Sequence, residues 1–273
     1  MAERPLTLMA VHAHPDDEAS TTGGILAKYS QEGVRTVLVT CTNGELGDTP
    51  SAKPGDDHHD TADVVALRLR ELEESCAVLG ITHLETLGYH DSGMMGWEAN
   101  DAPGSFWSMP VAEGAAPLAE LMRRYQPDVV VTYDDFGFYG HPDHIQAHRI
   151  TLAALDATGS TAKLYFPTFR RSGLVGFRDQ LESAGIELPD IDEGSFGAPD
   201  EAIGATIDCR EHAPAKRAAL AAHVSQAENI FFLQIPMEPF TQMFGIEEFI
   251  RVRPVDAEGV ETDLFAGLPG RES

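Results

Sequence analysis

The sequence of 273 residues has few cysteines and lacks long apolar runs. Its three cysteines, Cys41, Cys76 and Cys209, are widely spaced in apolar or strand-like contexts. This predicts reduced core residues, with neither a disulfide framework nor a metal knuckle. No apolar stretch approaches the ~18 residues that cross a bilayer, and the first residues lack the basic and apolar segments of a signal peptide. We therefore expect a globular, cytoplasmic protein.

Positive charge is also scarce. The sequence has 19 basic residues against 44 acidic ones, which gives a formal net charge of −25 at pH 7. A surface of this sign repels nucleic acids and anionic membranes. We therefore expect neither nucleic acids nor membranes as partners. The charge does not decide whether the protein forms a homo-oligomer.

Apolar, β-branched runs alternate with segments of helical spacing over the first 155 residues. Strands are predicted at residues 6–11, 34–41, 84–89 and 128–133, with weaker candidates at 163–167 and 205–209. Helices are expected at residues 20–29, 61–79, 111–125, from Pro142 to 155, at 174–184 and at 212–228. This alternation predicts an α/β fold, a Rossmann-like, twisted, mostly parallel sheet with helices on both faces. Since no flexible linker divides the chain, we expect a single domain over 1–273, with the core in 1–168 and a smaller C-terminal part, 169–273, shaping the substrate site.

Two clusters of metal-capable side chains follow predicted strands. The segment 12–18 follows the first strand, and His141, Asp143, His144 and His148 follow the strand at 128–133. Ligands of α/β proteins bind at the carboxyl ends of strands, and two imidazoles with one carboxylate leave open positions on a divalent ion. His12 or His148 alone would be interpreted as structural, and acidic residues at a helix start as N-capping. Two coincident clusters predict a metal or catalytic site.

The motifs His14-Pro15-Asp16-Asp17-Glu18 and Gly140-His141-Pro142-Asp143-His144 resemble the paired motifs of the PIG-L/LmbE family of zinc-dependent N-deacetylases. The resemblance is nearest to the family's actinobacterial mycothiol deacetylases and mycothiol S-conjugate amidases. It implies hydrolysis of an N-acyl amide through a zinc-bound water. The implied substrate is a small amino sugar of the N-acetylglucosaminyl-inositol type, or alternatively a thiol conjugate.

The same resemblance implies a role for each motif residue. The implied metal ligands are His14, Asp17 and His144, for Zn²⁺ or alternatively Fe²⁺. Asp16 matches the general base, His141 the residue that stabilises or protonates the tetrahedral intermediate, Asp143 its orienter, and Tyr139 a group that polarises the amide carbonyl. The positions that match the sugar site are Arg68, Asp91, Ser92 and Met94.

Several questions stay open at this point. Thr21 stands where the conjugate amidase has a lysine, which favours a deacetylase, whereas residues 261–267 resemble the amidase terminus. His223 and Gln226 match a family helix near the substrate, or are plain surface residues. The segment 97–110 is either a surface lid or substrate loop, or an ordinarily packed loop. Two other classes of protein are alternatives. Non-haem Fe(II) oxygenases share the set of two histidines and one carboxylate, but the sequence does not indicate the double-stranded β-helix expected of such an oxygenase. A sugar-binding module would not need Asp16.

Overall fold

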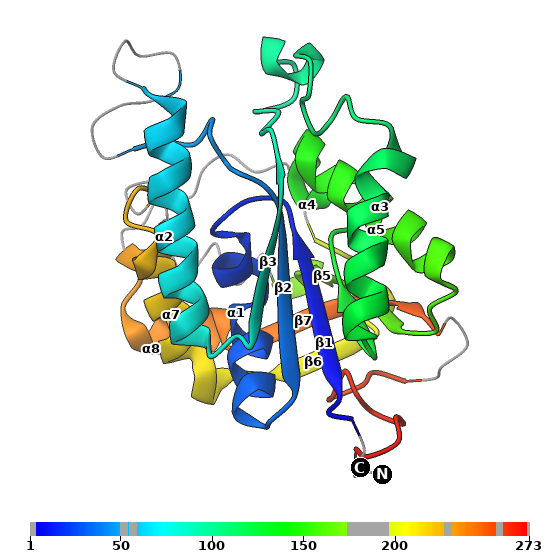
Figure 1. Cartoon of the computed structure of the whole chain (residues 1–273). Coiled ribbons are helices and arrows are strands. Elements are labelled where there is room, and N and C mark those ends of the chain that lie inside the picture. Colours follow the sequence, from blue (N-terminus) through cyan, green and yellow to red (C-terminus); the bar gives the residue numbers. More distant parts are fainter. Residues whose placement is uncertain are drawn as a thin grey trace.

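A seven-stranded sheet organises the residues that the computed structural model describes, which are 4–49, 54, 59–173, 197–226, 231–254 and 259–271 (Figure 1). The strand order is β3-β2-β1-β4-β5-β7-β6. The strands are β1 (Thr7–His12), β2 (Arg35–Thr42), β3 (His83–Tyr89), β4 (Val129–Val131), β5 (Lys163–Thr168), β6 (Ala205–Asp208) and β7 (Ile246–Arg253). Strands β1 to β5 pair in parallel, and β7 is antiparallel to both of its neighbours. The predicted mostly parallel sheet is confirmed.

Helices cover both faces of the sheet, as the side-chain alternation of β1 shows. Leu8 and Ala10 lie in one apolar layer, and Met9 and Val11 lie in the other. The first layer contains α1 (Asp17–Gln31), α2 (Thr61–Leu79), α7 (Ala213–Ala222) and α8 (Met237–Phe244). The second contains α3 (Val111–Tyr125) and α5 (Pro142–Thr158). Because every other residue of a strand points to the same face, a continuous apolar run such as β1 serves two cores at once.

Shorter elements complete the described chain. They are α4 (Gly137–Gly140), η1 (Glu98–Asp101), η2 (Asp200–Ala202), η3 (Arg210–His212) and η4 (Phe231–Gln234). Several boundaries differ from prediction. Helix α1 begins at Asp17 instead of residue 20. Asp17 and Glu18 lie in its first turn, where the helix dipole stabilises carboxylates. Helix α7 ends at Ala222, before the predicted 228, and β4 has three residues. The predicted helix at 174–184 lies outside the described residues.

The C-terminal part continues the same sheet. Strand β7 pairs with β5, and β6 pairs with β7. The segment 261–267, which resembles the amidase terminus, packs at the C-terminal end of α1: Leu264 and Phe265 are fully buried, and the Tyr29 hydroxyl donates to Asp263 Oδ1 at 2.9 Å. Lys163, at the amino end of β5, lies 2.7 Å from Glu261. The segment therefore lies at the edge of the sheet opposite the strand ends that carry the motifs.

Two further expectations can be compared with the structure. Cys41, Cys76 and Cys209 are buried with free thiols, as predicted. Among the described residues, no helix has both the length and the hydropathy required to cross a membrane.

Candidate active site

The two motifs meet where the order of the strands reverses. Strand β1 lies between β2 and β4, and the helices that follow β1 and β4, α1 and α5, pack on opposite faces. Such a switch point leaves a crevice beyond the carboxyl ends of the strands. Here the ring centroid of His14 lies 4.5 Å from that of His141 and 5.3 Å from that of His144. All three side chains are buried.

The carboxylate of Asp17 approaches one imidazole from each motif. His14 Nδ1 lies 3.4 Å from Asp17 Oδ2, and His144 Nε2 lies 3.4 Å from Asp17 Oδ1. In a tetrahedral site with bonds of about 2.0–2.2 Å, ligand atoms are about 3.3–3.6 Å apart. His144 Nε2 is also buried without a hydrogen-bond partner among the described residues, which costs free energy unless another group binds it. The donor set fits a divalent metal ion.

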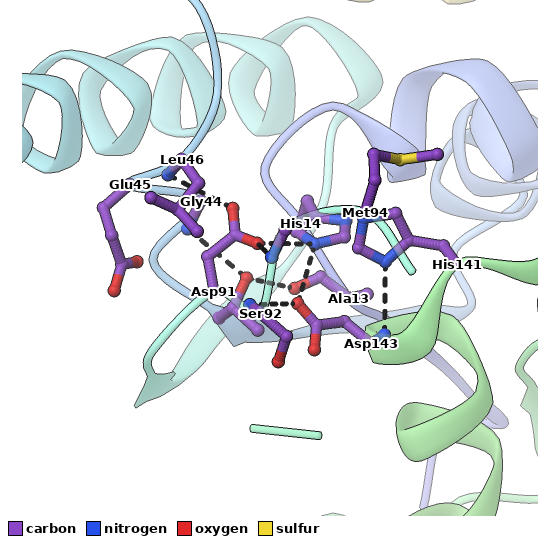
Figure 2. A network of polar contacts seen from close by, with 12 residues as sticks. Ala13, His14, Gly44, Glu45, Leu46, Asp91, Ser92, Met94, His141 and Asp143 are labelled. Carbon is purple, nitrogen blue, oxygen red and sulfur yellow. Dashed lines mark hydrogen bonds and ion pairs between the residues drawn. The ribbon is translucent and has the colours of Figure 1, made fainter. Parts of the chain in front are cut away.

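His14 is oriented by two carboxylates behind it. Its Nε2 lies 3.2 Å from Asp143 Oδ2 and 3.7 Å from Asp91 Oδ1 (Figure 2). An ionised carboxylate only accepts hydrogen bonds, so Nε2 carries a proton, and Nδ1 faces Asp17 Oδ2. Carboxylates behind metal-binding histidines commonly fix the tautomer in this way. The side chain of Asp143 therefore orients His14, whereas the sequence analysis assigns it to His141.

Other combinations of these side chains are close enough to share an ion. The ligand atoms of His14, His141 and His144 lie within 4.8 Å of one another, and so do those of His14, Asp91 and Asp143. The second group is already linked internally, because Asp143 Oδ2 also accepts the Ser92 backbone N–H at 2.9 Å. The cluster as a whole can hold a metal.

His141 is held as a neutral imidazole with a defined tautomer. Its Nδ1 accepts the Asp143 backbone N–H at 3.2 Å, so the ring proton is on Nε2. Burial, together with the neighbouring His14 and His144, lowers the pKa of His141 to about 2. The ring of Tyr139 lies edge-on to that of His144, with centroids 5.0 Å apart, and Tyr139 is half exposed. His141 and Tyr139 are thus hydrogen-bond donors beside the metal-capable cluster.

Asp16 has a strained backbone. Its φ of 120° and ψ of −24° lie in a region that L-residues rarely adopt, at a typical cost of about 1–3 kcal/mol. The partly buried carboxylate lies 3.2 Å from Arg68 Nη2. Burial raises the pKa of Asp16 to about 6, against the opposing effect of Arg68. A carboxylate with this pKa is ionised at neutral pH and is a stronger base than an ordinary aspartate.

Arg68 donates hydrogen bonds to backbone carbonyls of two loops at the site. Its Nη1 donates to the Gly44 carbonyl at 2.8 Å, and its Nη2 donates to the Pro15 carbonyl. An added Cβ at Gly44 or Gly47 would lie 2.5 or 2.3 Å from Nη1, so the guanidinium needs glycine at both positions. Arg68, placed at the sugar site by the resemblance, holds Asp16 and its loop in this structure.

The turn from Asp91 to Met94 divides into a buried and an exposed part. Ser92 is fully buried, and its hydroxyl bonds Ser105 Oγ and the Trp107 N–H, each at 2.9 Å. Asp91 is buried against His14, which lowers the pKa of Asp91 although burial alone would raise it. Met94 is exposed and lies beside His14 and His141 (Figure 2). Of the predicted sugar contacts on this turn, Met94 offers the accessible side chain.

The segment 97–110 packs against this turn. Asn100 Nδ2 donates to the Ser92 carbonyl at 2.6 Å, and Phe106 is fully buried against Tyr89, with ring centroids 5.0 Å apart. Trp107 lies under the Arg149 guanidinium, 4.7 Å from its ring centroid. These contacts hold the segment against the turn.

The remaining histidines of the motifs are structural, as expected. His12 Nε2 bonds Thr22 Oγ1 at 2.8 Å, and His148 Nδ1 bonds the Tyr133 carbonyl at 2.9 Å. Of the two interpretations of His223, that of a plain surface residue is wrong, because the side chain is fully buried. Tyr133, which was not predicted from the sequence, stacks on His144 with ring centroids 4.1 Å apart. Its place at the end of a buried strand beside the second cluster was the available signal.

The fold and the site define an α/β protein with a metal-capable His/Asp cluster at the switch point of its sheet. The chain belongs to the PIG-L family: the family model, described as GlcNAc-PI de-N-acetylase, matches residues 9–155. A relative from Thermomonospora curvata, named 1D-myo-inositol 2-acetamido-2-deoxy-alpha-D-glucopyranoside deacetylase, is 41% identical, with 100% of each chain covered. A relative of the same name from Acidothermus cellulolyticus is 42% identical, over 96% of this chain and 95% of its own.

Solved structures share the fold at lower identity. N,N'-diacetylchitobiose deacetylase from Pyrococcus horikoshii has a TM-score of 0.59 at 21% identity, covering 90% of this chain and 83% of its own. The 4-carboxy-2-hydroxymuconate hydratase from Pseudomonas putida also reaches 0.59, at 18% identity, covering 93% and 99%. Since a hydratase has this fold, the architecture alone does not define the reaction. The described residues form one mostly parallel sheet, which does not support the alternative of a double-stranded β-helix oxygenase.

Proposed function

We propose that this protein is a zinc-dependent N-deacetylase that hydrolyses the acetamide of N-acetylglucosaminyl-inositol. The observation that carries the proposal is the approach of the Asp17 carboxylate to His14 Nδ1 and to His144 Nε2, each at 3.4 Å, with Asp16 and its strained backbone next to it. The substrate is inferred from the relatives that are about 40% identical over nearly the whole chain and are named as deacetylases of this glycoside. A small-molecule substrate also agrees with the net charge of −25.

In this proposal the metal ligands are His14 Nδ1, Asp17 and His144 Nε2. When bound, a divalent ion supplies the Lewis acidity that amide hydrolysis requires. Asp91 and Asp143 hold His14 from behind, and Tyr133 stacks on His144, so that both imidazoles keep their orientation. Zn²⁺ suits two nitrogen donors and a carboxylate, and Fe²⁺ is the alternative ion.

The proton transfers follow from the neighbouring groups. Asp16 accepts a proton from the attacking water and returns it to the nitrogen as the C–N bond breaks, which releases acetate and the free amine. His141, neutral with its proton on Nε2, donates a hydrogen bond to the oxyanion of the tetrahedral intermediate, and the Tyr139 hydroxyl can donate a second. Each donor of this kind contributes about 10²–10³-fold in rate. Met94 provides an apolar contact for the sugar.

The test is acetate release from N-acetylglucosaminyl-inositol, measured beside hydrolysis of a bimane-labelled mycothiol conjugate. We expect acetate release that chelation abolishes and Zn²⁺ restores. Asp16→Asn should keep one metal ion per chain and lose about 10²–10⁴-fold in kcat. Full activity after verified metal removal would contradict the metal role. Faster cleavage of the conjugate would identify an amidase instead.

A further inference from the structure

A fully buried ion pair lies directly beneath the strained turn of Asp16. His223 Nε2 lies 2.8 Å from Glu18 Oε1, and Ser75 Oγ donates to the same oxygen at 2.5 Å. All three side chains are inaccessible to solvent. They come from three separate segments: Glu18 from α1, Ser75 from α2, and His223 from the exit of α7. We call Glu18, Ser75 and His223 the helix junction.

The helix junction reaches the proposed base through its backbone. Glu18 Oε2, the oxygen that His223 does not contact, accepts the backbone N–H of Asp16 at 3.0 Å. Asp16 is the residue with a φ of 120°, and its side chain makes no capping hydrogen bond to α1. One carboxylate therefore joins His223 to the amide of a residue whose backbone conformation is unfavourable.

The position of His223 is itself fixed by α2. The chain leaves the helical conformation at His223, where ψ is 61°. Two residues later, the backbone N–H and the hydroxyl of Ser225 donate to the Glu71 carboxylate, at 2.8 and 2.6 Å. Because both ends of this turn are anchored on buried carboxylates, the imidazole cannot follow Glu18 if Glu18 moves.

We propose that His223 is a positioning residue, which acts through Glu18 to hold the Asp16 backbone in the conformation that directs its carboxylate to the reaction. A buried carboxylate without its partner is strongly unfavourable. Removal of His223 would leave Glu18 Oε1 without one of its two donors and allow the carboxylate to turn away from the Asp16 N–H. The strained turn would then relax, while the three proposed metal ligands are held by other contacts. The proposal rests on the proposed function in assigning the base to Asp16.

The kinetic test compares His223→Ala with His223→Gln, whose amide can still donate to Glu18. For His223→Ala we expect kcat to fall about 10–100-fold, the usual effect of removing an outer-shell partner, with KM and metal content within twofold of the unmodified enzyme. His223→Gln should regain most of the loss. In the Asp16→Asn background, His223→Ala should have no further effect on kcat, because the two residues act in one series.

A second measurement does not depend on turnover. Amide hydrogen exchange at Asp16 should accelerate in His223→Ala and return toward its original rate in His223→Gln. The matched control is His148→Gln, which replaces another buried histidine that bonds the Tyr133 carbonyl. It should leave the exchange rate at Asp16 unchanged.

The outcomes separate the two proposals. An unmodified enzyme without deacetylase activity would refute the proposed function, and the exchange measurement would still decide the role of His223. Unchanged exchange and unchanged kcat in a folded His223→Ala variant would overturn the positioning role. So would a loss of metal in parallel with kcat, or an equal loss of kcat in the Asp16→Asn background.

Discussion

Two buried clusters of charged groups lie along helix α1. They differ in how many of their polar atoms have hydrogen-bond partners. At its middle, Glu247 Oε1 accepts from Lys216 Nζ at 2.6 Å and from the Gly24 N–H at 2.8 Å, while Oε2 accepts from the Ile25 N–H at 2.9 Å. An added Cβ at Gly24 would lie 2.7 Å from Glu247 Oε1. Glycine thus allows this close approach, and both carboxylate oxygens have partners.

The cluster at the N-terminal end of α1 is built in the opposite way. His144 Nε2 and Asp143 Oδ1 are buried without hydrogen-bond partners among the described residues, and Asp16 is strained. Buried polar atoms are nearly always paired in native proteins, and local rules are usually broken at functional sites. We therefore infer that the middle cluster contributes to the stability of the fold and that the terminal cluster contributes to catalysis.

The largest expected effect is on the terminal cluster. Asp17→Asn should lower kcat/KM at least about 10³-fold, because the Lewis acidity of a bound ion is worth several kcal/mol. Metal content measured by atomic absorption should fall with activity. The free energy of unfolding without metal should change little, since the amide oxygen can still accept the His14 backbone N–H, which now donates to Asp17 at 2.7 Å. A large loss of stability in this variant would assign Asp17 to the fold instead.

The middle cluster should respond in the reverse sense. Glu247→Ala leaves Lys216 buried without a partner, which should cost about 3–5 kcal/mol of unfolding free energy, measured by urea titration. The activity of the folded fraction should stay within about twofold. The double variant Lys216→Met/Glu247→Leu should recover most of the stability, because apolar replacement of a buried pair is often neutral or stabilising. Loss of turnover in the stable double variant would show that the two clusters are not independent.

The sequence predicted the sheet and the meeting of the two motifs because both depend on short-range patterns. The run Leu6 to Val11 reads as a doubly buried strand, and the motif at its end has a fixed place in a parallel sheet. The direction of β7 could not be predicted, since antiparallel pairing of the tail with β5 depends on contacts between distant segments. The place of residues 261–267 was equally hidden: their resemblance suggested substrate choice, and their contacts with Tyr29 lie at the opposite edge of the sheet.

Within the site, residue types were predictable and their partners were not. The motif spacing identified the histidines and carboxylates, whereas the hydrogen bond that Glu18 accepts from the Asp16 N–H is seen only in the structure. The contact of Asp143 with His14 requires knowledge of ring orientation, which spacing does not provide. His223 was left as either a residue near the substrate or a plain surface residue, because its partner lies 205 positions away in the chain.

The smallest expected effect is a pH window in stability that tests the helix junction. Burial alone would lower the pKa of His223, but the Glu18 carboxylate raises it above its ordinary value of 6.5. Burial alone would raise the pKa of Glu18, but His223 lowers it below its ordinary 4.5. A raised histidine pKa stabilises the fold below about pH 6.5, and this contribution is lost as pH rises through the raised value. A lowered glutamate pKa stabilises it above about pH 4.5, and this contribution is lost as pH falls through the lowered value.

The ion pair should therefore contribute most between about pH 4.5 and 6.5. We expect the difference in unfolding free energy between the unmodified protein and His223→Gln to be largest in that window and to shrink on both sides, whereas the corresponding difference for His148→Gln should not follow this profile. A difference that is constant from pH 4 to pH 9 would mean that His223 is neutral in the folded protein. His223 would then hold Glu18 by a plain hydrogen bond. In that case the stability contributed by the helix junction, like that of the cluster at the middle of α1, would not depend on a histidine charge.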